Sequence, residues 1–149
     1  KLALVKKIKK HVRDLKIIVD LTRSDPDKRD YFVSNRKIEK KTTLNILKKD
    51  GLVVSLGGGG FINSSIKKEV LSSSVSFWLD LDIKSLLPRL RNIKKRPLLN
   101  QENLEKNVNK IYLNRKKIYN EANFRIKCNA KNISEIVEKI IKLYENSKN

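Results

Sequence analysis

Short apolar runs alternate with longer amphipathic segments along the chain. The runs are rich in Val, Ile, Leu and Phe and lie between polar or glycine-containing stretches, which is typical of buried strands. They predict strands at residues 15–21, 52–56 and 75–79, and the alternation of apolar and polar residues in FRIKC predicts another strand at 124–128. Between them, apolar residues recur every three or four positions, as on one face of a helix. This spacing predicts helices near residues 2–12, at 36–49, 63–71, 83–90 and 102–121, and from Ser134 onward.

Particular residues mark the expected ends of these helices. Asp50-Gly51 ends the helix at 36–49, because glycine readily adopts the backbone conformation that stops a helix. Asn63 and Ser134 are predicted to cap the helices that follow them, since their side-chain oxygens can accept from free backbone N–H groups. The apolar face predicted for the helix at 36–49 consists of Ile38, Leu44 and Leu47. The apolar face predicted for the last helix consists of Ile136, Val137, Ile140, Ile141 and Leu143.

The alternation of strands and helices predicts an α/β fold with a parallel sheet. With 149 residues, the chain is long enough for one domain, residues 1–149, with a substantial core. Residues 22–30 and 72–74 are polar and are predicted as loops, as is the basic stretch 92–103 with its Pro97. Ligands of such sheets bind beyond the carboxyl ends of the strands, so a site is expected there.

Composition narrows the class of protein. Hydrophobic residues make up 39% and charged residues 34%, a globular profile, and no apolar run approaches the roughly 20 residues of a membrane helix. The first residue is Lys1, which indicates that the sequence begins inside a reading frame, and KLALVKKIKK does not read as a secretory signal. The single cysteine, Cys128, is predicted to be a buried structural thiol in a reducing compartment, the cytoplasm.

The net charge of +19 has two readings. A strongly basic chain suggests a nucleic-acid-binding protein. Codon bias is the favoured alternative, since Lys, Asn and Ile all have A/T-rich codons and all are abundant here. The lysines are scattered as pairs over several segments, and aromatic residues are not interleaved with them as stacking on bases would require. Either reading leaves a surface that attracts anionic ligands.

Residues 52–61 read LVVSLGGGGF, so a predicted strand runs directly into four consecutive glycines. Glycines at the carboxyl end of a strand let a ligand approach the backbone with no Cβ in the way and expose N–H groups to it. A tight strand-to-helix turn needs only one or two, so the run favours a ligand site. The run is not a Walker A loop, because no Gly-x-x-x-x-Gly-Lys-[Ser/Thr] occurs in the 149 residues.

Four motifs resemble those of the shikimate kinases in order and spacing. They are VVSLGGGG, SFWLDLD, the RPLL of the predicted loop at 92–103, and NRKKIYNEAN in the following helix. Arg36-Lys-Ile-Glu39 is also similar to the second half of the family's Phe-Arg-x-x-Glu. The resemblance covers residues 36–149. It implies a three-layer P-loop kinase fold of the nucleoside monophosphate kinase type, and ATP-dependent phosphorylation of the shikimate 3-hydroxyl in aromatic amino acid biosynthesis.

The resemblance also implies roles for particular residues. Arg36 and Arg115 would bind the carboxylate of shikimate, and the backbone at Gly58 and Gly59 would contact its ring. A guanidinium fork suits a carboxylate at two points, and these arginines are kept in a chain in which Lys outnumbers Arg. Arg96 in RPLL would contact the nucleotide and close on the transferring phosphoryl group, where it would stabilise the spread charge.

The nucleotide and the metal have implied contacts of their own. Arg89 would flank the adenine, with the loop at 129–133, including Lys131, on its other side. Ser55 would order a magnesium-bound water, and Asp20 would match the first acid of the family's Phe-x-Asp-x-Asp. ATP is therefore the implied co-substrate, and Mg²⁺ the implied metal.

The front of the chain departs from the family pattern. The family begins with a strand and a P-loop, and residues 1–35 read instead as a truncated or degenerate front part, with Thr22 where the second acid would stand. In the family the P-loop strand is central, between the strands corresponding to 52–56 and 75–79. Those two strands are therefore expected to pair directly, to leave a gap or to borrow a strand. Little or no kinase activity is expected, because the P-loop positions the phosphates.

Three functions remain open at this point. The first is a shikimate kinase with impaired activity, the second a non-catalytic remnant that binds shikimate or another anion, and the third a basic nucleic-acid-binding protein. A related kinase of small molecules, such as a gluconate kinase, fits RPLL and the glycine turn less well. The expected partners are shikimate and ATP, with neither a membrane nor nucleic acid, and the chain is expected to be a monomer.

Overall fold

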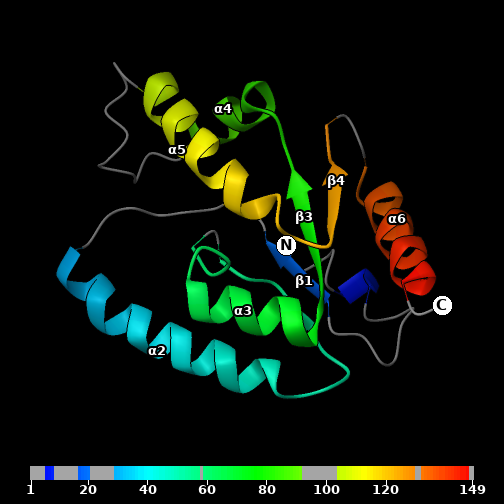
Figure 1. Cartoon of the computed structure of the whole chain (residues 1–149). Helices are drawn as coiled ribbons and strands as arrows, with labels where there is room; N and C mark the ends of the chain where they lie inside the picture. Colours follow the sequence, from blue (N-terminus) through cyan, green and yellow to red (C-terminus); the bar gives the residue numbers. More distant parts are fainter. Residues whose placement is uncertain are drawn as a thin grey trace.

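Four parallel strands form one sheet in the computed structural model of the protein (Figure 1). The structure describes residues 6–8, 17–20, 29–57, 59–91, 104–129 and 132–147, with the backbone alone at 17–20, 29–36, 89–91 and 104. The strands are β1 (Ile17–Asp20), β2 (Val53–Val54), β3 (Val75–Asp80) and β4 (Phe124–Lys127). Their spatial order is β2-β1-β3-β4, so the predicted parallel sheet is confirmed.

Strand β1 stands between β2 and β3. Ile17 is level with Val53 on one side and with Val75 on the other, and the pairing with β3 continues to Asp20 and Trp78. The position that the resemblance assigns to a P-loop strand is therefore occupied by Ile17–Asp20. Strands β2 and β3 were expected to pair directly, to leave a gap or to have another strand between them. The structure has the third arrangement, with β1 between them.

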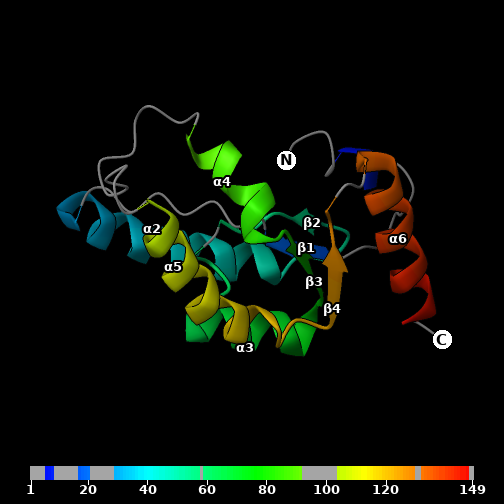
Figure 2. The ribbon, with the colours of Figure 1, turned by 90° about the horizontal axis from the view of Figure 1, so that it is seen from above.

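Helices cover both faces of the sheet (Figure 2). On one face lie α2 (Arg29–Leu47), α3 (Ser64–Ser73) and α5 (Leu104–Tyr119). On the other lie α6 (Ile133–Asn146) and the short helical segment 6–8. The remaining helix, α4 (Ile83–Arg91), follows β3 and packs on α5. The predicted three-layer α/β architecture is confirmed.

Alternation along β3 divides the core between the two faces, because successive side chains of a strand point to opposite sides. Phe77 and Leu79 pack with the buried residues of α6. Trp78 lies on the other side, in the cluster that joins α2, α3 and α5. The members of that cluster are Leu47, Leu56, Phe61, Ile66, Val70, Trp78 and Tyr119.

Three details of the predicted helices are wrong. Helix α2 begins at Arg29, inside the segment predicted as a loop, and Ile38 is 62% exposed instead of sharing a buried face with Leu47. Ile38 and Leu47 are nine residues apart, about two and a half turns, which places them on opposite sides of the helix. The cap of α6 is Asn132, not Ser134, because the Asn132 side chain accepts from the backbone N–H of Glu135.

The predicted cap of α3 is confirmed, because the Asn63 side chain accepts from the backbone N–H groups of Ser65 and Ile66. Gly51 has a φ of 67°, in the left-handed region that other residues avoid, but α2 already ends at Leu47, two residues earlier than predicted. Cys128 is buried, as expected of a structural thiol.

Candidate functional site

The glycine run forms a turn that connects β2 to α3. The backbone N–H of Gly60 donates to the carbonyl of Gly57 at 2.8 Å, and the N–H of Asn63 donates to the carbonyl of Gly60 at 3.1 Å. Leu56 and Phe61 are both buried on either side of the glycines. The turn is thus anchored at its two ends, and Asn63 then starts the helix.

The glycines of this turn differ in what surrounds them. A Cβ at Gly60 would lie 3.2 Å from the Leu56 Cβ and 3.3 Å from the Gly57 carbonyl oxygen, which is too close for an undisturbed turn. A Cβ at Gly59 would meet nothing within 4 Å. Of the glycines that the structure describes, only Gly51 has a positive φ, so Gly57, Gly59 and Gly60 do not serve a left-handed backbone. Gly60 is therefore needed for the close packing of the turn, whereas the backbone of Gly59 lies open to a ligand.

Helix α2 reaches this turn through Glu39. A Cβ at Gly57 would lie 3.4 Å from the Glu39 Oε1 atom, so the carboxylate lies beside the first glycine. Arg36 is one turn before Glu39 on the same helix, since residues three apart are neighbours on a helix surface. The structure describes the backbone of Arg36 and not its side chain.

Helix α5 reaches the turn from another direction. The ring of Tyr119 lies 6.4 Å from the ring of Phe61, which directly follows the glycines, and 6.0 Å from the ring of Trp78. Arg115 is half-buried and lies about one turn before Tyr119. The helices that carry Arg36 and Arg115 therefore cover the same face of the sheet, and each contacts the turn through a neighbouring residue.

Ser55 and Asp20 lie at the carboxyl ends of adjacent strands. The register pairs Ile18 with Val54, so Ser55 follows one residue beyond this pair and Asp20 two residues beyond it. Hydroxyl and carboxylate oxygens are ligands that suit Mg²⁺, which usually keeps several waters and takes few protein ligands. The structure describes the backbone of Asp20 and not its side chain, so a magnesium site at this pair stays a prediction from residue type and strand position.

The other predicted site residues are only partly described. Gly58, Arg96 and Lys131 lie outside the described residues. Arg89 is in α4, where the structure describes its backbone and not its side chain. Within the described ranges there is no group of three His, Cys, Asp or Glu residues that could hold a metal, and no helix there is long and apolar enough to cross a membrane.

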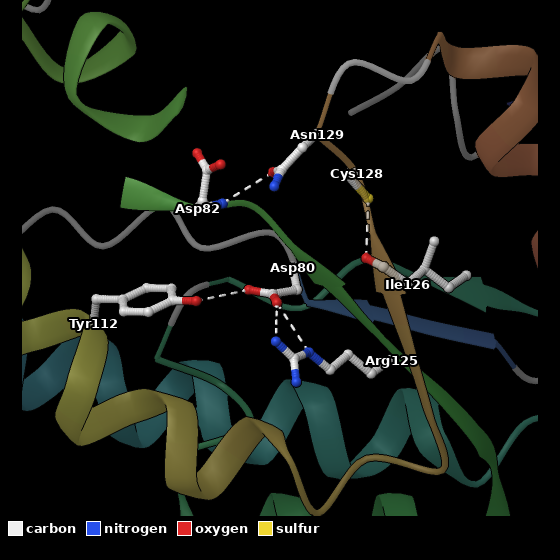
Figure 3. Close-up of polar contacts among 7 residues, drawn as sticks. All are labelled: Asp80, Asp82, Tyr112, Arg125, Ile126, Cys128 and Asn129. Carbon is white, nitrogen blue, oxygen red and sulfur yellow. Dashed lines mark hydrogen bonds and ion pairs between the residues drawn. The ribbon is translucent and has the colours of Figure 1, made fainter. Parts of the chain in front are cut away.

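A buried carboxylate stands at the carboxyl end of β3 (Figure 3). Asp80 is 6% exposed, and its Oδ2 atom accepts from Arg125 Nε at 2.9 Å and from Arg125 Nη2 at 2.6 Å. Its Oδ1 atom accepts from the Tyr112 hydroxyl at 3.0 Å. Burial first, and the hydrogen bond to Asp80 second, raise the pKa of the Tyr112 hydroxyl above its ordinary value. The carboxylate joins β3, β4 and α5.

Asp82 links the start of α4 to the end of β4 (Figure 3). Its Oδ1 atom accepts from the backbone N–H of Ser85 at 2.7 Å, and its own N–H donates to the Asn129 side chain at 3.1 Å. Hydrogen bonds from Ser85, from the hydroxyl first and the backbone N–H second, hold the pKa of the Asp82 carboxyl below its ordinary value. Next to it, Cys128 N–H donates to the Asp80 carbonyl at 2.8 Å and extends the pairing of β3 with β4.

Sequence reasoning missed the contacts of Asp80, Tyr112 and Arg125. Asp80 was part of a motif and Tyr112 part of an apolar helix face, but neither pattern identifies a partner. One signal for Arg125 was present, because an arginine kept in a Lys-rich chain indicates a need for its planar fork. The same argument supported Arg36 and Arg115, which the resemblance had identified, and it applies equally to Arg125.

A hollow lies at the amino end of β3, opposite the carboxyl end at which the site is predicted. It has a volume of about 360 Å³ and is lined by Asp50, Leu71, Ser72, Ser73, Ser74, Val75 and Tyr144. The hydroxyls of Ser72 and Ser73 donate to the carbonyl of Glu69, within their own helix. Parallel sheets bind ligands at the carboxyl ends of their strands, and this hollow is at the amino end of β3.

Comparison with known proteins agrees with the motifs. A model of the shikimate kinase family matches residues 29–145. The shikimate kinase of Bartonella henselae is 34% identical over 107 residues, 72% of this chain and 51% of that protein. The shikimate kinase of a Sulfurihydrogenibium species is 38% identical over 111 residues, 74% of this chain and 64% of that protein. The chain thus spans about half to two thirds of the length of these curated relatives.

Solved structures agree on the fold. A shikimate kinase from Acinetobacter baumannii, in complex with shikimate, matches with a TM-score of 0.77 at 20% identity, over 99% of this chain and 87% of that one. A shikimate kinase from Aquifex aeolicus matches with a TM-score of 0.73 at 19% identity, over 99% and 90% of the two chains. At these identities the likeness establishes a common fold and not a common activity.

Proposed function

Since this chain belongs to the shikimate kinase family, we propose that it binds shikimate at the glycine turn and serves its ATP-dependent phosphorylation at the 3-hydroxyl. The reaction class is phosphoryl transfer to a small cyclic alcohol that carries a carboxylate. The observation that supports this proposal most is the arrangement around residues 57–61. Glu39 of α2 and Tyr119 of α5 both contact this turn, and Gly59 presents its backbone to open space.

The two helices would supply the groups that recognise the carboxylate. Arg36 lies one turn from Glu39, and Arg115 lies about one turn from Tyr119. Two guanidinium forks can each donate two hydrogen bonds to a carboxylate, which gives both charge and direction. The bare backbone at Gly58 and Gly59 would receive the ring, because a side chain there would occupy its place.

The nucleotide side of the proposed site has fewer residues in this chain. Arg89 and Lys131 would flank the adenine, and Arg96 would stabilise the charge on the transferring phosphoryl group. Ser55 and Asp20 would hold Mg²⁺, which neutralises phosphate charge when it is bound. The 149 residues contain no Gly-x-x-x-x-Gly-Lys-[Ser/Thr], so the backbone amides and the lysine that position the β- and γ-phosphates have no counterpart here.

We therefore expect the chain by itself to bind shikimate but to transfer phosphate slowly. A coupled assay of ADP release with shikimate and Mg-ATP measures the transfer, and titration calorimetry measures shikimate binding without nucleotide. We expect calorimetry to detect the heat of shikimate binding. We expect the coupled assay to give a turnover far below about 1–100 per second, the range that is typical of kinases. Turnover within that range would contradict the expected impairment, and absence of binding would contradict the proposed site.

Two adjacent glycines provide a matched test of the turn. Gly59→Ala adds a methyl group to open space, so it should leave stability unchanged and weaken shikimate binding about tenfold or more, since the methyl competes with the ligand. Gly60→Ala crowds Leu56 and the Gly57 carbonyl, so it should lower the free energy of unfolding by about 1–3 kcal/mol. Calorimetric binding and chemical denaturation measure the two effects. Equal losses of stability in the two variants would contradict this division of roles.

The remaining expectations follow from the same proposal. We place the protein in the cytoplasm as a monomer. The buried thiol of Cys128 agrees with this place, because free thiols persist in reducing compartments.

The net charge of +19 leaves nucleic-acid binding as the competing function. Binding to duplex or single-stranded nucleic acid at physiological salt, weakening steeply as salt rises, would favour that alternative.

A further inference from the structure

Tyr112 and Tyr119 hold helix α5 on the sheet on either side of Arg115. Tyr112 lies three residues before Arg115 and Tyr119 four residues after it, so all three share one side of the helix. Tyr119 packs against Phe61 and Trp78 with tilted rings at 6.4 and 6.0 Å. Tyr119 is itself 2% exposed, so it is closely packed against both rings. These contacts hold the C-terminal end of α5 on the sheet.

The contact of Tyr112 is directional. Its hydroxyl donates to Asp80 Oδ1 at 3.0 Å, and hydrogen bonds weaken steeply when they are misaligned. Asp80 is 6% exposed, so a turn of α5 that moved Tyr112 away would leave a buried carboxylate oxygen without this partner. This hydrogen bond therefore resists a rotation of α5 about its axis near the middle of the helix.

Asp80 is itself held from the other side. Arg125 donates twice to its Oδ2 atom, and the same guanidinium lies over the Trp78 ring, 4.7 Å from its centroid. Trp78 is 2% exposed and cannot move without disturbing the core. The guanidinium is therefore restrained by both the ring and the carboxylate, and the Oδ1 atom faces Tyr112 in a defined direction (Figure 3).

We propose that Tyr112 is a positioning residue, which through Asp80 and Arg125 helps to set the rotation of α5 and so the direction in which Arg115 presents its guanidinium to a carboxylate ligand. The role of Arg115 in this statement rests on the proposed function. A guanidinium group donates two hydrogen bonds to a carboxylate only when the two groups lie in about the same plane. A rotation of α5 would turn the guanidinium of Arg115 out of that plane. Tyr112 then contributes to the selection of an acid over a neutral analogue without touching either.

The test compares shikimate with its carboxamide, which lacks the charge but keeps the ring. Tyr112→Phe removes the hydroxyl and keeps the ring under Lys116, whose Nζ lies 5.8 Å from the ring centroid. We expect this variant to reduce the preference for shikimate over the carboxamide about five- to tenfold while the affinity for the carboxamide stays within about twofold. A purely structural defect would weaken both ligands alike and would contradict the proposal, as would an unchanged preference.

Two further variants sharpen this result. Tyr144→Phe makes the same chemical change in α6, on the other face of the sheet, and should leave the preference unchanged. Arg125→Lys keeps the charge and loses the planar fork, so it should reduce the preference in the same direction, and it decides the matter should Tyr112→Phe not fold. In the Tyr112→Phe background, Arg115→Lys should cost less affinity than in the wild type, because coupled residues are not additive.

A measurement without ligand separates this inference from the proposed function. The Nε–H group of Arg115 gives its own signal in a nitrogen-edited NMR spectrum, and we expect that signal to shift or broaden in Tyr112→Phe but not in Tyr144→Phe. A wild-type chain that binds neither ligand contradicts the proposed function and leaves this signal to decide the inference. An Arg115 signal that is the same in Tyr112→Phe and in the wild type overturns the positioning role, whatever the ligands do.

Discussion

Asp80→Asn should lower the free energy of unfolding by about 2–4 kcal/mol, a large part of the stability of a domain of this size. The substitution keeps the volume of the side chain and removes its charge. It leaves the guanidinium of Arg125 facing an amide, where a carboxylate accepted two hydrogen bonds. Removing one partner of a buried pair costs 3–5 kcal/mol in general, and the expected value is lower because the Arg125 side chain is 37% exposed.

An exposed ion pair in the same protein provides the control. Lys67 Nζ lies 2.7 Å from Glu121 Oε2, with side chains 25% and 47% exposed. Glu121→Gln makes the same chemical change as Asp80→Asn and should cost about 0–1 kcal/mol, because water already solvates both charges. Unfolding in guanidinium chloride, followed by the fluorescence of the single Trp, measures both variants. Equal losses would contradict the view that Asp80 anchors three elements of the fold.

Arg115→Lys should weaken the binding of shikimate about ten- to a hundredfold while the helix content of the chain is retained. Lysine keeps the positive charge but is a single point, whereas the guanidinium of arginine forms a fork that matches a carboxylate. Hydrogen bonds to charged groups contribute about 1.5–3 kcal/mol each, which corresponds to this range of affinity. Titration calorimetry with shikimate, with circular dichroism as a check of the fold, gives both quantities.

The reverse substitution, of a lysine by arginine on the same helix, provides the control. Lys110 is exposed on α5, and Lys110→Arg should leave the affinity for shikimate within about twofold of the wild type. A loss of affinity in Lys110→Arg equal to that in Arg115→Lys would indicate a general effect of charge on this helix. Retention of full affinity in Arg115→Lys would remove Arg115 from the proposed site.

The place of β1 in the sheet affects the shikimate side and the phosphate side of the proposed site differently. Ile17–Asp20 fills the position between β2 and β3, so the sheet is continuous from β2 to β4 without a Walker A sequence. Because the sheet is continuous and parallel, the carboxyl ends of β2 and β3 lie at the same edge of it. The shikimate side of the proposed site depends on this edge, whereas the phosphate side depends on a loop that these 149 residues do not contain.

The sequence by itself determined the kinds of element, their order and the parallel sheet. Apolar spacing is a property of neighbouring residues, so LVVSL and VSFWL predict strands wherever they pack. The glycine run predicted a ligand site at the carboxyl end of a strand, because residues without Cβ leave the backbone open to a ligand. The sequence also predicted the family of the protein, since the family's motifs occur in the expected order and spacing along the chain.

Only the tertiary structure decided which elements meet. Tyr112 and Asp80 are 32 residues apart in the sequence and Arg125 and Asp80 are 45 apart, and no local pattern pairs residues over such distances. Packing likewise exposed Ile38 and placed β1 between β2 and β3. A helix or strand offers several faces and edges of similar local energy, and the choice among them depends on the burial and the hydrogen bonds of the whole fold.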